Sequence, residues 1–140
     1  MRPFLISLFL MSLPVATLAD NAISPVRVSP VATTSETASG QPIVLPQGAV
    51  RVVVSRYTIA PGAKLPVHKH PHPRYGYVEA GTLAVYDADT GKRYDYKPGD
   101  FIVEVLDQWH YGENSGAVPL ELLVIDQMPK DSQSNTVIRP

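Results

Sequence analysis

The chain has 140 residues, in which 12 Lys and Arg against 13 Asp and Glu give a formal net charge of −1 at neutral pH. This balance argues against nucleic acid as a partner, because domains that bind it usually carry a strongly basic face. Hydrophobic residues make up 44% and charged residues 18%, which is the composition of an ordinary globular domain. The absence of cysteine excludes disulfides, thiolate metal sites and a cysteine nucleophile.

The first residues have the pattern of an export signal. Arg2 supplies a positive charge, residues 4–13 form an apolar run with serines, and a candidate cleavage site ends at Ala19. The apolar run is shorter than the ~20 residues that cross a bilayer, so the pattern favours a cleaved signal over a membrane anchor. We therefore predict a signal peptide over 1–19, a periplasmic or secreted mature chain, and no membrane association after cleavage.

The rest of the chain alternates short apolar segments with turn residues and shows no sustained helical period, which predicts an all-β fold. The dipeptides Pro61-Gly62 and Pro98-Gly99 are typical of type II turns. Many short strands favour a sandwich or closed barrel, since an open sheet would leave adhesive edges. The expected strands are 50–59, 65–70, 75–78, 83–86, 93–96, 101–104, 109–112 and 120–125.

These elements divide the chain into four parts. Residues 1–19 are the signal peptide, and residues 20–48 are an arm with edge strands near 25–31 and 43–45. Residues 49–127 form the β-barrel. Residues 128–140 are a polar tail that we expect to be loose.

Three of the four histidines lie within five residues of each other. Residues two apart in a strand point to the same face, so His68 and His70 would share a face while Lys69 points away. Two neutral imidazoles on one face are suited to a metal, and His110, in a later strand, is a candidate third ligand. The alternative is a solvent-facing histidine pair with a separate core histidine, and the spacing alone leaves both open.

Two groups of residues resemble the two sequence motifs of the cupin family. The resemblance extends to small single-domain cupins that are similar to quercetin dioxygenase, and it covers residues 28–126. It implies a double-stranded β-helix, also called a jelly-roll barrel. It rests on Gly62, His68, Lys69, His70 and Gly81 for the first motif and on Gly99, His110 and Asn114 for the second.

Cupins typically bind one divalent metal inside the barrel through two first-motif histidines, a glutamate and a second-motif histidine. The resemblance implies His68, His70 and His110 as ligands here. The metal would be a divalent transition ion such as Fe, Mn, Ni, Zn or Cu, since imidazole suits several of them.

The chain departs from the family at Arg74, which stands seven residues before Gly81 where the glutamate often lies. Arginine stays protonated and is no metal ligand, so we expect a site of three histidines. If Arg74 points inward, it and the metal give the cavity three formal positive charges and a preference for anions. An outward-facing Arg74 is equally compatible with the sequence. His72 could act as an additional ligand, but Pro71 and Pro73 disturb the strand geometry that this requires.

Two functions remain open. The first is a metal-dependent enzyme, a dioxygenase-like protein or an isomerase, that acts on a small organic molecule, which would be an anion if Arg74 faces the cavity. The second is a non-catalytic cupin that holds a metal or small ligand as a carrier or sensor. The sequence identifies no catalytic residue. The family and the strand-like arm both favour a homodimer.

Overall fold

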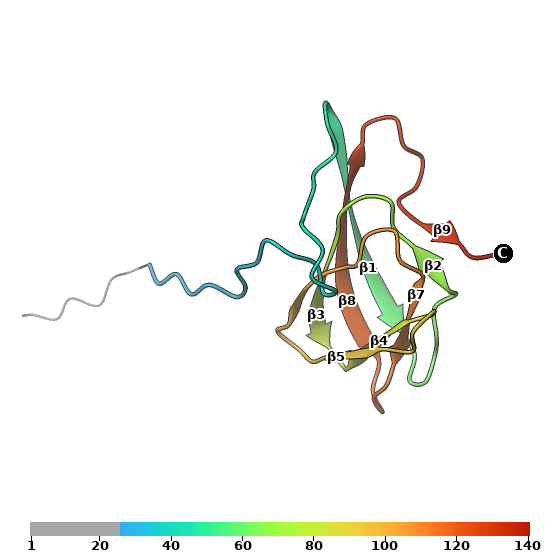
Figure 1. Ribbon diagram of the computed structural model, residues 1–140. Helices are drawn as coiled ribbons and strands as arrows, with labels where there is room; N and C mark the ends of the chain where they lie inside the picture. Colours follow the sequence, from blue (N-terminus) through green and yellow to red (C-terminus); the bar gives the residue numbers. More distant parts are fainter. Residues whose placement is uncertain (1–25) are drawn as a thin grey trace, which may run out of the picture.

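A computed structural model describes residues 26–140, and these residues form an all-β structure without helices (Figure 1). The predicted signal peptide over 1–19 lies outside the described residues. No helix among residues 26–140 is long and apolar enough to span a membrane. The strands are β1 Val50–Ile59, β2 His68–Lys69, β3 Arg74–Ala80, β4 Leu83–Asp87, β5 Arg93–Tyr96, β6 Phe101–Val103, β7 His110–Asn114, β8 Leu120–Pro129 and β9 Val137–Ile138.

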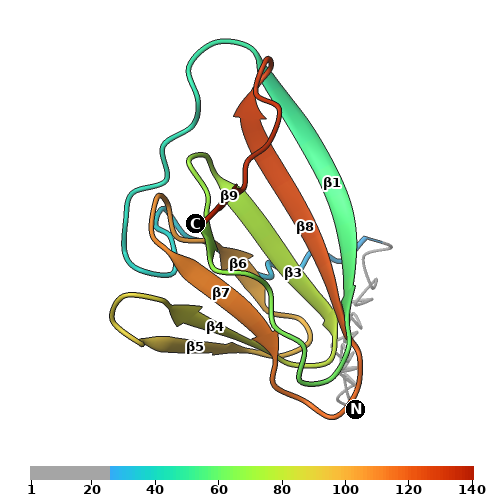
Figure 2. The same ribbon diagram turned by 90° about the vertical axis from the view of Figure 1, so that its right-hand side faces the viewer.

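The strands form two antiparallel sheets that face each other. One sheet has the order β1-β8-β3-β6 and the other β5-β4-β7-β2-β9. Figure 2 shows β1, β8 and β3 as one layer and β7, β4 and β5 as the other. Strand order that jumps along the chain in both sheets is typical of a jelly roll, as the resemblance stated above implied.

The core lies between the sheets. In β8, every second side chain is buried, from Leu120 to Met128, because alternate residues of a strand point to one face. The buried cluster comprises Ile59, Val78, Leu83, Ile102, Leu120, Leu122 and Val124. Leu122 and Val124 of this cluster line a cavity that His68 and Arg74 also line, so the apolar core adjoins a polar group.

The structure agrees with the predicted strands 50–59 and 93–96 at both ends. The predicted strand 65–70 is shorter, since β2 contains only His68 and Lys69. Leu65 still donates its N–H to the Gly112 carbonyl at 2.8 Å, so this segment begins to pair with β7 before Pro66 interrupts it. Proline has no N–H and cannot continue the ladder.

Two expectations about the chain ends were wrong. The arm forms no edge strands at 26–31 or 43–45, and its pairing within the described residues is the isolated bridge between Glu36 and Pro42. The tail is not loose throughout. Strand β9 pairs with β2, and Asn135 is 2% exposed. Its polar composition misled the prediction, because the polar groups of this segment are used in buried hydrogen bonds.

Candidate metal centre

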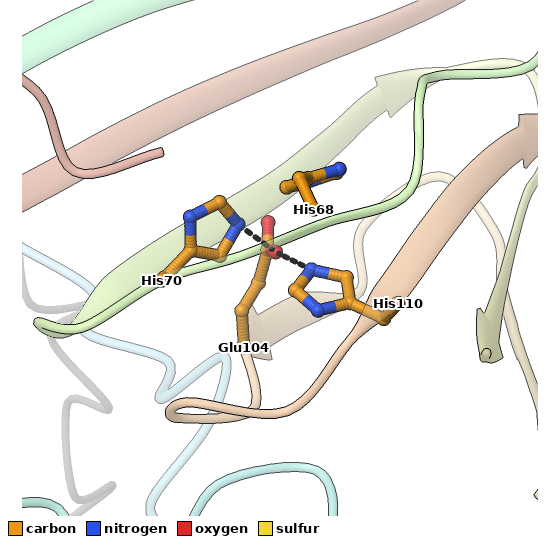
Figure 3. Close-up of side chains that lie close together, drawn as sticks. All are labelled: His68, His70, Glu104 and His110. Atoms are coloured by element: carbon orange, nitrogen blue, oxygen red, sulfur yellow. Dashed lines mark hydrogen bonds and ion pairs between the residues drawn. The ribbon is translucent and has the colours of Figure 1, made fainter. Parts of the chain in front are cut away.

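Four side chains converge between the sheets, three of them from the neighbouring strands β2 and β7 or next to them and one from the end of β6 in the other sheet (Figure 3). His68 lies on β2 directly opposite His110, the first residue of β7. His70 follows β2 by one residue, and Glu104 follows β6. The alternation expected for the His68-Lys69-His70 segment holds, since Lys69 points away from this group and forms an ion pair with Asp107.

The three imidazoles lie close enough to share one ion. Their ring centroids are 4.5 Å apart for His68 and His110, 4.8 Å for His68 and His70, and 5.0 Å for His70 and His110. One ligand atom from each histidine and one from Glu104 all lie within 4.8 Å of one another. The site could therefore hold a metal ion through three nitrogens and one oxygen.

Hydrogen bonds orient every ring of this group. The Nδ1 atoms of His68, His70 and His110 lie 2.6, 2.7 and 2.8 Å from the carbonyl oxygens of Pro66, Asn135 and Gln108, respectively. A carbonyl only accepts, so each Nδ1 must carry the proton. This leaves the Nε2 lone pairs as the metal-binding atoms, which is the arrangement that orients ligands in known metal sites.

Glu104 supplies the fourth ligand atom. Its Oε2 lies 3.1 Å from the Nε2 atoms of both His70 and His110, and its side chain is only 16% exposed. In the metal-free protein, a proton on the His110 Nε2 would donate to the carboxylate. A divalent cation would take the place of that proton, so the donor set fits a metal.

The sequence-based site of three histidines was incomplete, because the glutamate comes from the strand beside the expected one. Strands β3 and β6 pair Tyr75 with Val103, and one further step in this register places Glu104 opposite Arg74. The Glu104 N–H donates to the Arg74 carbonyl at 2.9 Å, which confirms that alignment. The carboxylate therefore comes from the end of the strand that pairs with β3. Arg74 occupies the position on β3 where cupins often have the glutamate.

A signal for Glu104 was present in the sequence. The predicted strand 101–104 places Glu104 two residues after Ile102, so both side chains face the interior. An acidic residue on the buried face of a strand needs a partner there, because an unpaired charge is costly to bury. A buried position of Glu104 in the predicted strand 101–104 therefore marks it as a residue that needs a cationic partner or a metal.

The electrostatics of the metal-free group favour a cation. Burial lowers the pKa of His68 to about 4, so this ring is neutral at neutral pH. Burial raises the pKa of Glu104, but hydrogen bonds from His110 and His70 outweigh it and the net shift is downward. Burial lowers the pKa of His110, yet the hydrogen bond to Glu104 and its charge outweigh that effect and raise it. Glu104 is therefore ionised beside the rings.

Arg74 points inward, which answers the question that its sequence position left open. Its side chain is 7% exposed and forms a bidentate pair with Asp126, from Nε to Oδ1 at 2.7 Å and from Nη2 to Oδ2 at 2.9 Å. Burial lowers the pKa of Arg74, but Asp126 and Glu104 outweigh it, so the net shift is upward. The expected three formal positive charges, from an inward Arg74 and a divalent metal, left out the carboxylates of Asp126 and Glu104. With Asp126 and Glu104 ionised, a divalent metal and Arg74 leave one formal positive charge.

His72 is not part of the group of side chains that could hold a metal ion. Its backbone N–H donates to the Asn135 side chain at 3.0 Å, and its side chain is partly exposed. His72 lies between β2 and β3, and Pro71 and Pro73 on either side of it prevent a regular strand here. The rule that alternate residues of a strand share a face therefore does not extend from His68 and His70 to His72. Asn114, from the second motif, is a structural residue that donates to the Ile59 and Val118 carbonyls.

A small cavity lies beside the centre and opens to the surface. The inner cavity has a volume of about 20 Å³ and is lined by His68, His110, Glu104 and Arg74 together with apolar residues. A wider recess of about 160 Å³ shares His68 and Arg74 with it and reaches the tail residues Thr136 and Ile138. The inner space admits about one water-sized group, while the recess admits a small molecule.

Comparison with known proteins places this fold. The family model described as a cupin domain matches residues 55–126. No curated protein matches the sequence. An uncharacterised conserved protein with a double-stranded β-helix domain from Klebsiella pneumoniae is 23% identical, with a TM-score of 0.51 over 82% of this chain and 98% of that one. This likeness concerns the fold alone.

Enzymes occur among the similar structures. The S161A mutant of Bacillus subtilis oxalate decarboxylase is 29% identical with a TM-score of 0.50, over 62% of this chain and 23% of the enzyme. A Lactobacillus farciminis oxalate decarboxylase, solved as a formate complex, is 22% identical with a TM-score of 0.52, over 62% of this chain and 26% of that one. The chain thus spans about a quarter of either enzyme.

Proposed function

Because this chain belongs to the cupin family, we propose that it binds one divalent transition metal through His68, His70, Glu104 and His110 and takes a small anionic ligand at that metal. The observation that carries the proposal is the orientation of the rings. All three Nδ1 atoms are hydrogen-bonded to backbone carbonyls, so all three Nε2 atoms are available to a metal, and those of His70 and His110 lie 3.1 Å from the Glu104 carboxylate.

The ligand set suits several metals. Three imidazoles and a carboxylate are compatible with Fe, Mn, Ni, Zn or Cu, and the supply in the compartment would select among them. Manganese centres are described in a structure of Bacillus subtilis oxalate decarboxylase that is 28% identical, with a TM-score of 0.50 over 62% of this chain and 23% of the enzyme. We therefore propose manganese as the first metal to test.

Arg74 gives the site its preference for an anion. Its Nη1 lies 3.4 Å from the His70 Nε2, while Nε and Nη2 are engaged by Asp126 and Thr136. A metal on the His70 Nε2 would occupy that lone pair and leave the Nη1–H free to donate to a ligand oxygen. The charge of +1 that remains matches a small carboxylate or enolate.

We propose an enzyme on this basis. A bound metal would polarise a ligand oxygen as a Lewis acid and, with dioxygen as oxidant, would support dioxygenase-like chemistry. Arg74 would orient the anion, and the apolar residues of the inner cavity, such as Leu83 and Leu122, would exclude water. A carrier or sensor that binds the same ligand without turnover is the alternative. The small inner cavity is its main support, because it accepts little beyond the coordinating group.

The pattern of residues 1–19 supports export of the chain to the periplasm or out of the cell, and we include this in the proposal.

The outer face of the first sheet supports a homodimer. Outward-facing Val54, Ile125 and Tyr75 lie side by side across β1, β8 and β3. The arm beside this face carries Val28, which is 83% exposed. We propose that the arm and face of one chain cover those of a second copy.

Metal binding with matched variants tests the function. The purified chain should bind one Mn²⁺ or Zn²⁺ per molecule, as measured by elemental analysis after dialysis. His110→Ala should lose binding at least tenfold because it removes a ligand, and His72→Ala should leave it unchanged. Equal losses in the two variants, or no binding by the wild type, would contradict the proposed site.

The same samples test the ligand and the reaction. Oxalate or formate should alter the electron paramagnetic resonance spectrum of the Mn²⁺ protein and should do so far less with Arg74→Gln. Loss of oxalate or uptake of oxygen that depends on the metal would support the enzyme. Binding without turnover across small carboxylates and enols would support the carrier.

A further inference from the structure

The three histidines of the site are oriented by hydrogen bonds of two kinds. His68 and His110 each donate to the carbonyl of the residue two positions earlier, Pro66 and Gln108. These bonds are local and form wherever the segment adopts this backbone. His70 instead donates to the carbonyl of Asn135, which lies 65 positions away in the tail. The orientation of His70 therefore depends on a tertiary contact. Asn135, which supplies the acceptor, lies outside residues 55–126, which match the cupin domain.

The side chain of Asn135 holds this part of the tail in place. Its Nδ2 donates to the Asp126 Oδ1 at 2.7 Å and to the His72 carbonyl at 3.1 Å. Its Oδ1 accepts the His72 N–H at 3.0 Å. The residue is 2% exposed, and all of these partners lie next to the site. A buried side-chain amide with this many partners also fixes the backbone of Asn135. The backbone carbonyl oxygen of Asn135 is the acceptor for the His70 Nδ1–H.

Asn135 also reaches the second charged group of the site. The Asp126 Oδ1 that accepts from Asn135 accepts from the Arg74 Nε as well, each at 2.7 Å. The next residue, Thr136, accepts from the Arg74 Nη2 at 3.0 Å and lines the open recess. One segment of the tail therefore contacts a candidate metal ligand, the arginine beside it, and the entrance.

We propose that Asn135 is a positioning residue of the metal centre: it anchors the tail so that its carbonyl holds the Nδ1–H of His70 and presents Nε2 to the metal. The proposal rests on the metal site inferred above. It assigns to the tail a part of the site that the two cupin sequence motifs do not contain. Outer hydrogen-bond partners of metal ligands typically change affinity by about 10- to 100-fold when lost.

Metal affinity of tail variants gives the first test. Asn135→Ala removes the anchor and should weaken Mn²⁺ or Zn²⁺ binding by about tenfold or more, as measured by competition with a chelator. Gln133→Ala alters an exposed residue of the same segment and should bind like the wild type. If Asn135→Ala fails to fold, Asn135→Asp keeps the size of the side chain and the acceptor for His72. It loses the donor to Asp126 and should also bind more weakly.

A nuclear magnetic resonance measurement separates positioning from a general effect on stability. In the metal-free wild type, the Nδ1–H of His70 should be protected from exchange with water. In a folded Asn135 variant it should exchange rapidly, while the Nδ1–H signals of His68 and His110 persist because their partners are local. A folded variant that keeps the His70 signal, or keeps wild-type affinity, would overturn the proposal. Wild-type protein that binds no metal would overturn the proposed function instead, and the metal-free spectra would still decide the role of Asn135.

Discussion

Arg74 and Glu104 together show how single residues build this site. Arg74 stands where cupins often have a metal-binding glutamate, and the carboxylate comes from the opposite position on the adjacent strand. Asp126 on the other neighbouring strand pairs with the arginine, so the row across the sheet alternates in charge. A cation beside His68, His70 and His110 is therefore compatible with an arginine that would otherwise repel it.

The metal affinity should fall on acidification. Glu104 raises the pKa of His110 above its ordinary value of 6.5, so a proton competes with the metal at His110 already near neutral pH. His68, with a pKa of about 4, stays neutral and adds a second competing proton only near that pH. We expect the affinity to drop by roughly tenfold per pH unit below neutrality. Titrations with Zn²⁺ between pH 7.5 and 5.5 check this, and a constant affinity over that range would argue against His110 as a ligand.

The convergence of the histidines could be anticipated at the residue scale, while the completion of the site could not. The parity of His68 and His70 predicted that two rings share a face, and the resemblance to cupins, not the spacing alone, favoured His110 as the third. Asn135 was not predicted, because no local sequence pattern distinguishes it. Its role depends on contacts with His70 and His72, which lie more than sixty positions earlier in the chain. Glu104 was overlooked because the expected glutamate was sought on the strand that carries Arg74.

The turn between β3 and β4 shows what the motif glycine does at the scale of elements. Gly81 has a φ of +75°, and a Cβ there would lie 2.6 Å from the Pro119 carbonyl oxygen and 2.7 Å from the Leu120 Cα. Both contacts are to backbone, which has little freedom to move away. The turn is therefore packed directly against the start of β8, and this packing sets the approach of β3 to β8.

Substitution of this glycine should be costly for two reasons. We expect Gly81→Ala to lower the free energy of unfolding by more than about 2 kcal/mol, through backbone strain and the clash. Gly99→Ala is the matched control, because its φ is +92° but a Cβ at this position would meet no atom within 4 Å, so only the strain of about 1–2 kcal/mol remains. Urea denaturation measures both. Equal losses would show that the contact with β8 contributes nothing.

Strands were predicted where alternation and turn residues agreed, as for β1 and β5. Prediction failed where polar or proline-rich chain ran beside the barrel. The polar composition of the tail predicted a loose chain end. In the structure, polar groups of the tail form hydrogen bonds with Asp126 and Arg74 in the interior. The arm was expected to pair as edge strands, and it does not, apart from one bridge between Glu36 and Pro42. Pairing between distant segments is not encoded in local pattern.

At the scale of the whole molecule, the site lies between the two sheets. The outer face of the first sheet, which points away from the site, carries apolar side chains. The outer face of the first sheet carries Tyr77 between Leu123 and Phe101, next to the row of Val54, Ile125 and Tyr75. The arm residues Thr33 and Ile43 line a recess with Tyr75 and Phe101 of this face, and the start of the arm runs away from the barrel in Figure 1. Exposed apolar surface of this kind is typical of protein contact sites.

The proposed dimer predicts a specific effect of charge on this face. Val54→Lys places a cation in the outer row and should shift the protein from dimer to monomer in sedimentation velocity, with metal content unchanged. Val118→Lys is the control, because Val118 is 57% exposed against 59% for Val54 but lies in the loop before β8. A wild-type protein that sediments as a monomer, or a Val54→Lys dimer as tight as the wild type, would be incompatible with this interface.

One metal ion held by three histidines and a glutamate is the basis of the proposed function. Crystals of the Zn²⁺-soaked protein, measured at the zinc absorption edge, test it directly. We expect one anomalous peak per chain, about 2.0–2.2 Å from the Nε2 atoms of His68, His70 and His110 and from a carboxylate oxygen of Glu104. No peak between the rings, or a peak that Glu104 does not contact, would contradict it.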